Sequence, residues 1–164
     1  MQMPDNASIK RTETIERAFA FIIGLIFLLL GIAGFIPGFM TLPVGSPDVA
    51  VDAPRLLLDD GYGYVLGLFP TNFLHNAVHI VVGVLGLAAS TSFSGALVYN
   101  RGFAIAYALI AVMGLLPFTN TTFGLMPIFG NNVWFNALTA LAAAYVGFVK
   151  PAELKNAGSF SPEI

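Results

Sequence analysis

The sequence predicts an all-α integral membrane protein, a four-helix bundle built from two repeated helical hairpins with both termini in the cytoplasm. Three observations predict it: an apolar composition, long stretches without charge, and a pair of similar segments. Of the 164 residues, 57% are hydrophobic and only 10% are charged, and the mean hydropathy is +0.81. Because soluble domains carry about 25% charged residues, this composition excludes a soluble monomer.

The charge balance and the lack of cysteine exclude further classes of protein. Seven Lys and Arg residues stand against nine Asp and Glu residues, so the chain has no basic surface for nucleic acid. With no cysteine, it has no disulfide framework, no thiolate metal site and no thiol catalysis. We therefore expect the lipid bilayer to be its main surrounding and no nucleic-acid partner.

Three windows of the chain carry no formal charge, and they locate the membrane helices. They run from Arg17 to Asp48, from Asp60 to Arg101, and from Arg101 to Lys150. A bilayer core needs about 20 apolar residues per helix. The first and second windows each fit one helix and the third fits two, which gives predicted spans of 18–37, 72–90, 102–117 and 133–149.

The remaining segments are predicted to be tails and loops of the membrane domain 18–149. Residues 1–17 and 150–164 are polar and form short cytoplasmic tails in this interpretation. The segment 38–71 holds several prolines and glycines and an excess of aspartate, and we expect it to be an acidic outer loop. A short polar turn at 118–124 separates the last two helices.

The basic residues set the orientation. If the N-terminus is inside, only Arg55 lies outside, and the basic residues on the inner side are Lys10, Arg11, Arg17, Arg101, Lys150 and Lys155. This distribution satisfies the positive-inside rule. We therefore expect a multi-pass protein of the bacterial inner membrane with both termini cytoplasmic.

An internal repeat predicts the two hairpins. Residues 68–79 and 128–139 are similar in register, and the matching pairs are Phe69/Phe129, Asn72/Asn132 and Asn76/Asn136. The simplest interpretation is two helical hairpins of the same orientation, packed about an axis along the membrane normal. The alternative is that apolar helices share short words by chance.

One face of each helix that follows the repeat is polar. At about 100° per residue, the second predicted helix aligns Asn72, His75, Asn76 and His79, and the fourth aligns Asn132, Asn136 and Thr139. Lipid does not tolerate a row of unsatisfied amides and imidazoles. We therefore expect both polar stripes to face the bundle interior.

The histidine pair has two interpretations. His75 and His79 are four residues apart on one helix face, so either or both could be axial ligands for haem iron or chlorophyll magnesium. Alternatively, they and the neighbouring asparagines pin the hairpins together, and we favour this structural role. No Asp or Glu falls inside a predicted span, so we expect no metal site of the usual bundle type.

Other kinds of chemistry find no support in the sequence. It contains no Ser/His/Asp arrangement, no phosphate loop and no buried acid–base pair, so we expect no catalytic residues and no enzyme activity. Transport is poorly supported as well, because no charged residue lies within the predicted spans.

The segment Leu66 to His79 resembles a family of unknown function of small four-helix bacterial membrane proteins, found in actinobacteria and cyanobacteria. Their shared word is close to L-F-P-x-N-x-x-H-N-x-x-H, and the resemblance covers roughly residues 14–149. It implies a four-helix membrane architecture, with a thylakoid location possible in a cyanobacterial host, but it implies no activity. Family members often carry a histidine in the last helix, where this chain has Phe135 and Thr139.

These observations lead to one functional expectation and one alternative. We expect a non-enzymatic accessory, assembly or structural component that docks in a larger membrane complex or forms a homo-oligomer. The alternative is a haem- or chlorophyll-binding membrane protein that uses His75, His79 or both as axial ligands.

Overall fold

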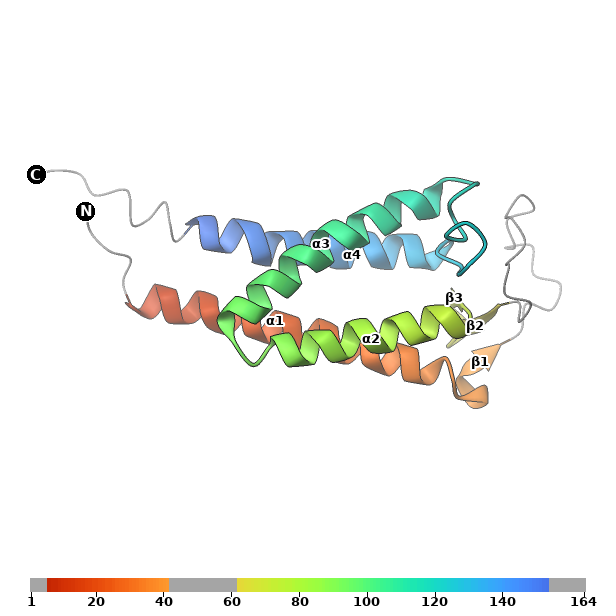
Figure 1. Ribbon diagram of the computed structural model, residues 1–164, viewed down its shortest axis with the longest axis horizontal. Coiled ribbons are helices and arrows are strands. Elements are labelled where there is room, and N and C mark those ends of the chain that lie inside the picture. The colour runs from red at the N-terminus through yellow and green to blue at the C-terminus, as the bar shows by residue number, and fades with distance from the viewer. Residues whose placement is uncertain (1–5, 42–61, 154–164) are drawn as a thin grey trace, which may run out of the picture.

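The computed structural model describes residues 6–41 and 62–153, and within them the chain is mostly helical (Figure 1). Most of the predicted acidic loop and the C-terminal tail beyond residue 153 lie outside the described residues. The four α-helices are α1 (Asn6–Ala33), α2 (Phe73–Ala89), α3 (Phe93–Leu115) and α4 (Asn131–Ala144). They alternate in direction along the bundle, as the predicted order of four helices requires.

Two helices begin earlier than the charge-free windows indicate. α1 begins at Asn6 and α3 at Phe93, so charged residues such as Arg17 and Arg101 lie within helices. A charge near a helix end interrupts an apolar window without interrupting the backbone hydrogen bonds. The start of α3 is fixed by Ser92, whose side chain accepts a hydrogen bond from the Gly95 N–H at 3.1 Å.

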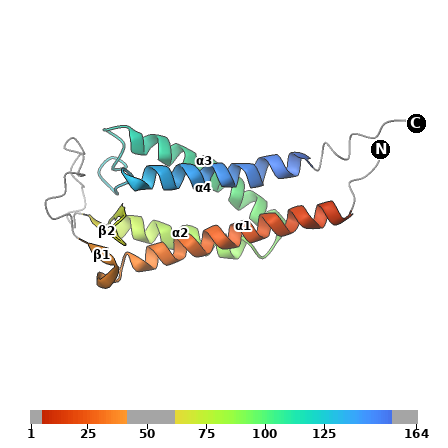
Figure 2. The same cartoon turned by 180° about the vertical axis from the view of Figure 1, so that it is seen from behind.

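Three helices are long and apolar enough to cross a membrane. They are Asn6–Ala33, Phe93–Leu115 and Asn131–Glu153, while Phe73–Ala89 is apolar but shorter. Both views of the bundle place α1 beside α2 and α3 beside α4 (Figures 1 and 2). The start of α1 and the end of the helix at Glu153 lie at one end, which we call the terminal end.

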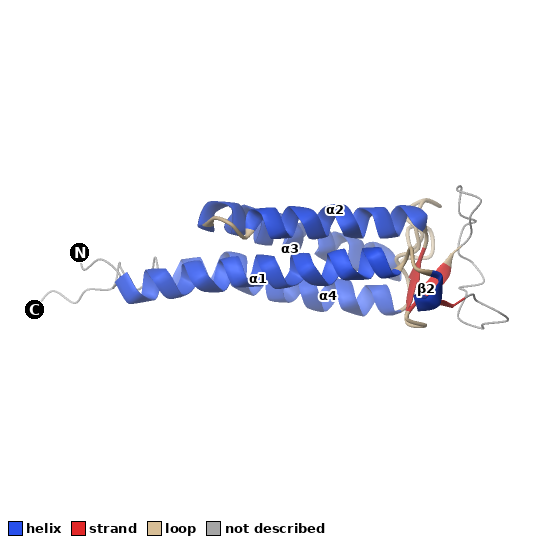
Figure 3. Cartoon of the chain, turned by 90° about the horizontal axis from the view of Figure 1, so that it is seen from below, coloured by secondary structure: helices blue, strands red, loops and turns tan. Residues whose placement is uncertain are grey.

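The prediction of an all-α fold is wrong at the opposite end, where a small antiparallel sheet covers the helices (red in Figure 3). Its strands are β1 (Met40–Thr41), β2 (Gly63–Val65) and β3 (Phe69–Thr71), in the order β1-β2-β3. The turn between β2 and β3 has positive φ at Leu66 and Gly67, a conformation that glycine adopts without strain. This short hairpin replaces a predicted loop. We call this the sheet end, and it also contains the segment 116–130.

Close contact between α1 and α2 depends on glycine. A Cβ atom built on Gly83 would lie 2.5 Å from the backbone nitrogen of Leu28, and one built on Gly24 would lie 2.7 Å from that of Leu87. Because the contacting atoms belong to the backbone, neither site admits a larger side chain at this separation. Small residues of this kind allow helices in membranes to pack closely.

Aromatic side chains fill the middle of the bundle. Phe27 is fully buried, and its ring centroid lies 5.2 Å from that of Phe103, 5.0 Å from that of Tyr107 and 5.5 Å from that of Phe135. Phe103 and Tyr107 stack with centroids 4.0 Å apart. These four residues, from α1, α3 and α4, form what we call the aromatic layer.

The last helix changes geometry near the terminal end. After Ala144 it continues as a π-helical turn, Tyr145–Val149. The Gly147 carbonyl in this turn accepts a hydrogen bond of 2.7 Å from Arg101 Nε on α3, and the Arg101 guanidinium lies over the Phe148 ring at 5.3 Å. Residue 151, which would donate to the Gly147 carbonyl in a regular α-helix, is a proline and has no N–H. This explains how Gly147 can accept the bond from Arg101.

Candidate functional site

The polar stripe predicted on α2 begins with a helix cap. Asn72 stands at the N-cap of α2, where its side-chain oxygen accepts a hydrogen bond from the His75 N–H at 3.0 Å. Its amide nitrogen donates to the Leu125 carbonyl at 2.9 Å. Asparagine is a preferred N-cap residue because it satisfies a free N–H of the first turn. Asn72 therefore starts α2 and also holds the segment 116–130 against it.

Asn132 makes the corresponding connection from α4. Its amide nitrogen donates to the carbonyls of Pro70 at 2.7 Å and Pro127 at 3.2 Å, and the residue is 2% exposed. The neighbouring Asn131 donates to the Leu68 carbonyl at 3.0 Å. Each helix pair thus contributes a buried amide that holds the loop region of the other pair.

Asn76 connects α2 to α1. Its amide nitrogen donates to the Gly34 carbonyl at 2.9 Å, and its side-chain oxygen accepts a hydrogen bond from the Thr71 hydroxyl. The Gly34 site is so close that a Cβ atom there would overlap the Asn76 side chain. Asn76 therefore joins the end of α1, the start of α2 and β3.

The matching positions on α4 have different roles. Asn132 lies inside α4, whose N-cap is Gly130 with φ of 63°, whereas Asn72 is itself the cap of α2. Asn136 is 2% exposed. Thr139 is half-buried and donates to the Phe135 carbonyl of its own helix at 2.8 Å. The equivalence of the two segments as a true repeat stays a prediction.

His75 and His79 are both buried, at 4% and 7% exposure, and their ring centroids lie 4.4 Å apart. The His75 ring contacts the Pro127 carbonyl, while its Nδ1 atom has no hydrogen-bond partner within the described residues. The His79 ring lies edge-on to Phe27 at 4.9 Å. The aromatic layer thus occupies the space beside His79.

This packing bears on the haem or chlorophyll alternative. A macrocycle bound to His79 on the side of Phe27 would have to displace that fully buried side chain. On α4 the positions that would supply a second ligand hold Phe135 and Thr139. Among the residues that the structure describes, no group of three or more His, Cys, Asp or Glu side chains could hold a metal ion. Axial ligation by His75 or His79 stays a prediction.

A second buried polar cluster lies toward the terminal end, where the sequence predicted only a cytoplasmic tail. Glu16 on α1 and Asn100 on α3 are both fully buried. The Asn100 amide nitrogen donates to Glu16 Oε2 at 2.6 Å and to the Glu16 carbonyl at 3.1 Å. The signal available in the sequence is that Glu16 stands four residues before Ala20, on the face that continues to Ile23 and Phe27.

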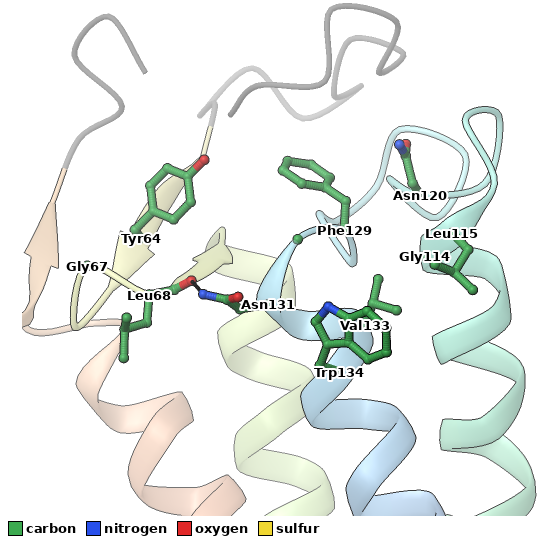
Figure 4. Close-up of a pocket in the computed structure, with 11 residues that line it drawn as sticks. Tyr64, Gly67, Leu68, Gly114, Leu115, Asn120, Phe129, Asn131, Val133 and Trp134 are labelled. Atoms are coloured by element: carbon green, nitrogen blue, oxygen red, sulfur yellow. Dashed lines mark hydrogen bonds between the residues drawn. The ribbon is translucent and has the colours of Figure 1, made fainter. Parts of the chain in front are cut away.

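A cavity of about 590 Å³ opens at the sheet end (Figure 4). Its walls come from the β2–β3 hairpin, the end of α3, the segment 116–130 and the start of α4. They consist of Tyr64, Gly67, Leu68, Gly114, Leu115, Asn120, Phe129, Gly130, Asn131, Val133 and Trp134. His75 and His79 do not line this cavity. Asn72 and Asn132 do not line it either, but their side chains donate hydrogen bonds to Leu125, and to Pro70 and Pro127, in the segments that form its walls.

Within the described residues, the surroundings of the cavity are aromatic and carry no charged side chain. Tyr62 lies edge-on to Phe129 with ring centroids 5.5 Å apart, and its ring is 5.9 Å from that of Tyr64. Burial, reinforced by the neighbouring Tyr64, raises the pKa of Tyr62 to about 12. The Tyr62 phenol is therefore neutral at ordinary pH.

Comparison with known proteins gives one match. A family model described as "Domain of unknown function (DUF4383)" matches residues 17–149. The matched region contains α2, α3 and α4, most of α1, and the cavity at the sheet end. Comparisons with curated proteins and with solved structures found no match.

Proposed function

The chain belongs to the family described as Domain of unknown function (DUF4383), and from this membership and the geometry above we propose that it is a non-enzymatic accessory component of a larger membrane complex. In this proposal all four helices cross the bilayer. The buried asparagines of the sheet end then serve to hold the two helix pairs together. The proposal leaves the outer faces of the helices to contact lipid and protein partners.

The proposal puts the terminal end on the cytoplasmic side of a bacterial inner membrane. Lys10, Arg11 and Arg17 lie in the first half of α1, and Lys150 lies at the far end of the helix that α4 begins. Because basic residues are retained on the cytoplasmic side, this end faces inward, with both termini. The sheet end then faces outward.

A groove between α3 and α4 carries the docking proposal. It has a volume of about 320 Å³, and its lining consists of Ala104, Ala108, Ala111, Val112, Leu115, Val133, Trp134, Ala137, Ala140, Leu141 and Ala144. Six alanines allow another backbone to approach closely, which is how helices associate in membranes. Exposed Val112 and Leu141 flank these alanines and would pack beside a docked helix.

The docking proposal is tested by filling the groove. Ala108 is exposed and lines it, so Ala108→Leu blocks the approach of a helix without burying a new side chain in the core. The matched control is Ala106→Leu, which adds the same group to an exposed position of α3 outside the groove. Each variant is expressed in the native host and extracted in mild detergent. Native electrophoresis then measures the mass of the extracted complex.

The proposal expects a wild-type complex much larger than the 17.4 kDa chain and its micelle. It expects Ala108→Leu to release the chain from that complex and Ala106→Leu to leave the complex intact. A complex whose mass is a small multiple of the chain would indicate a homo-oligomer instead. A monomeric wild type, or equal behaviour of the two variants, would contradict docking through this groove.

A further inference from the structure

The cavity at the sheet end has the size and lining of a binding site for a small neutral molecule. Its volume of about 590 Å³ falls within the range of about 300–1,000 Å³ that is usual for ligand pockets. Among the residues that the structure describes, none that lines the cavity is charged. A charged ligand would lose its hydration there without gaining an opposite charge, so the lining favours an uncharged ligand.

Two polar groups of the lining lack a partner in the described part of the chain. Asn120 is 6% exposed and its Oδ1 atom has no hydrogen-bond partner there, and the Tyr64 hydroxyl has only the similarly buried Tyr62 hydroxyl beside it. A buried polar group left unpaired costs about 1–3 kcal/mol, and each such group calls for an explanation. A ligand with several hydroxyl groups would pair with both.

The Asn120 side chain is not needed to form its own turn. The backbone N–H of Asn120 donates to the Leu116 carbonyl at 2.9 Å, and its carbonyl accepts from the Ile128 N–H at 2.8 Å. These two bonds fix the local backbone whatever the side chain is. The side-chain Oδ1 atom is therefore free to accept a hydrogen bond from a ligand.

Aromatic rings supply half of the large apolar side chains of the lining, beside Leu68, Leu115 and Val133. In Figure 4, Tyr64 lies on the β2–β3 hairpin, Phe129 on the segment that leads into α4, and Trp134 on the first turn of α4. Phe129 is 6% exposed and forms part of the wall, while Trp134 is 68% exposed and stands at the rim. A sugar ring has C–H groups on its faces, which pack on aromatic rings, and hydroxyl groups at its edge, which bond to amides.

The walls are held in place before any ligand arrives. The Asn131 amide bonds to the Leu68 carbonyl at 3.0 Å, and the Asn132 amide bonds to the Pro70 carbonyl at 2.7 Å. Both bonds join the start of α4 to the β2–β3 hairpin on the other side of the cavity. A wall fixed in this way lowers the ordering cost of binding.

We propose that this cavity binds one neutral sugar ring, carried either by a soluble saccharide or by the headgroup of a glycolipid. The ring packs against Trp134 and Tyr64, and its hydroxyl groups donate to Asn120 Oδ1 and bond to the Tyr64 hydroxyl. The site does not depend on the docking proposal. The groove and the cavity share Leu115, Val133 and Trp134, but Ala108 lines only the groove. Ala108→Leu therefore changes no residue of the cavity lining, and the two proposals can fail separately.

Trp134 provides a direct readout, because it is the single tryptophan of the chain. The full-length protein is placed in phosphatidylcholine nanodiscs without sugar-based detergent, and Trp134 emission is followed during titration. The soluble probe is methyl β-glucoside, and the lipid probe is monoglucosyl diacylglycerol added to the nanodisc. Methyl β-glucuronide, which carries a carboxylate on the same ring, is the charged control.

A saturable change with at least one neutral probe and none with the glucuronide is the expected result. A response to the glycolipid alone supports the site and identifies a membrane headgroup as its ligand. A response to the soluble glucoside as well supports the site and shows that the ring alone is sufficient. No response to either neutral probe, or an equal response to the glucuronide, overturns the proposal.

Two variants test the assigned contacts. Asn120→Ala and Tyr64→Phe each remove one hydrogen-bonding group, and each is expected to weaken binding about tenfold. Phe118→Leu, at an exposed position of the same end outside the lining, is expected to bind as wild type does. Circular dichroism checks that each variant is folded. If Asn120→Ala does not fold, the affinity of Tyr64→Phe alone tests the proposal. A folded variant of either kind with unchanged affinity also overturns the proposal.

Discussion

Three asparagine side chains, Asn72, Asn76 and Asn132, each donate from the amide nitrogen to a backbone carbonyl of another segment. All three are almost fully buried, at 5%, 3% and 2% exposure. A buried carbonyl that loses its donor keeps the cost of desolvation. Each amide therefore stabilises the backbone of a neighbouring segment, and Asn72 also caps its own helix.

We expect Asn132→Leu to lower the free energy of unfolding by about 2–4 kcal/mol, because it leaves the buried carbonyls of Pro70 and Pro127 without this donor. Unfolding in sodium dodecyl sulfate, followed by circular dichroism, measures the change. Asn131→Ala is the matched control. That side chain is exposed and makes one hydrogen bond, to Leu68, so we expect a loss below about 1 kcal/mol. Equal losses in the two variants would contradict this role of Asn132.

The sequence allowed part of this arrangement to be predicted. Spacing along a helix placed Asn72, His75, Asn76 and His79 on one face, because helical geometry is regular over four residues. The acceptors could not be predicted, because they are the backbone carbonyls of Leu125, Gly34 and Pro70, which are distant in sequence from the asparagines that donate to them. Their positions depend on how the loops fold. Every residue has a backbone carbonyl, so the residue type does not indicate which carbonyl accepts a hydrogen bond.

At the scale of helices, α1 and α2 pack so closely that their contact depends on the lack of a side chain. In the crossing region, Gly83 faces Leu28 and the Gly24 carbonyl. Such contacts gain dispersion energy because many atoms meet at short distances. One added methyl group there forces the two helices apart along several turns.

We expect Gly83→Ala to destabilise the bundle by about 1–3 kcal/mol, which is the usual cost of overpacking a tight contact. Gly102→Ala is the matched control on α3, since a Cβ atom there meets nothing within 4 Å. Alanine also favours the helix, so the control is expected to stabilise by about 0.4–1 kcal/mol. The same unfolding measurement applies to both variants, and effects of the same sign would refute the assigned contact.

The number of helices could be predicted from charge-free windows, but their starts and the sheet could not. The length of α1 and α3 is set by backbone hydrogen bonds and by a cap such as Ser92, and these continue past charged residues. The strands have two or three residues each. Such short strands form only because the neighbouring strand is in place to pair with them. Two or three residues are too few to show the alternation of apolar and polar residues that predicts a strand.

At the scale of the whole molecule, the interior consists of three layers. The polar residues of the sheet end include His75 and Asn132, and the polar pair toward the terminal end is Glu16 and Asn100. The aromatic layer around Phe27 separates them. The sequence analysis assigned Glu16 to a cytoplasmic tail. A charge-free window shows where the charges stop, but it cannot show that a carboxylate next to the window is buried in the bundle. The cavity could not be predicted from the sequence, because its walls come from four separate segments that only the fold brings together.

We expect this arrangement to prevent conduction of protons or ions, because the buried aromatic layer interrupts the polar path between the two ends. Liposomes that contain the protein should dissipate a proton gradient no faster than liposomes without it. A pH-sensitive dye inside the vesicles measures the rate, and gramicidin provides the positive control. Flux that depends on His79 would instead indicate that the protein is a small channel or transporter.

The π-helical turn at Tyr145–Val149 has a consequence for any alignment of the last helix. A π turn accommodates one more residue than an α turn, so every side chain after it is rotated by about 100° from its α-helical position. Val146 and Gly147 within the turn are both buried against the rest of the bundle. A helical-wheel diagram drawn without a break at Tyr145 therefore assigns the last turns, up to Glu153, to the wrong face.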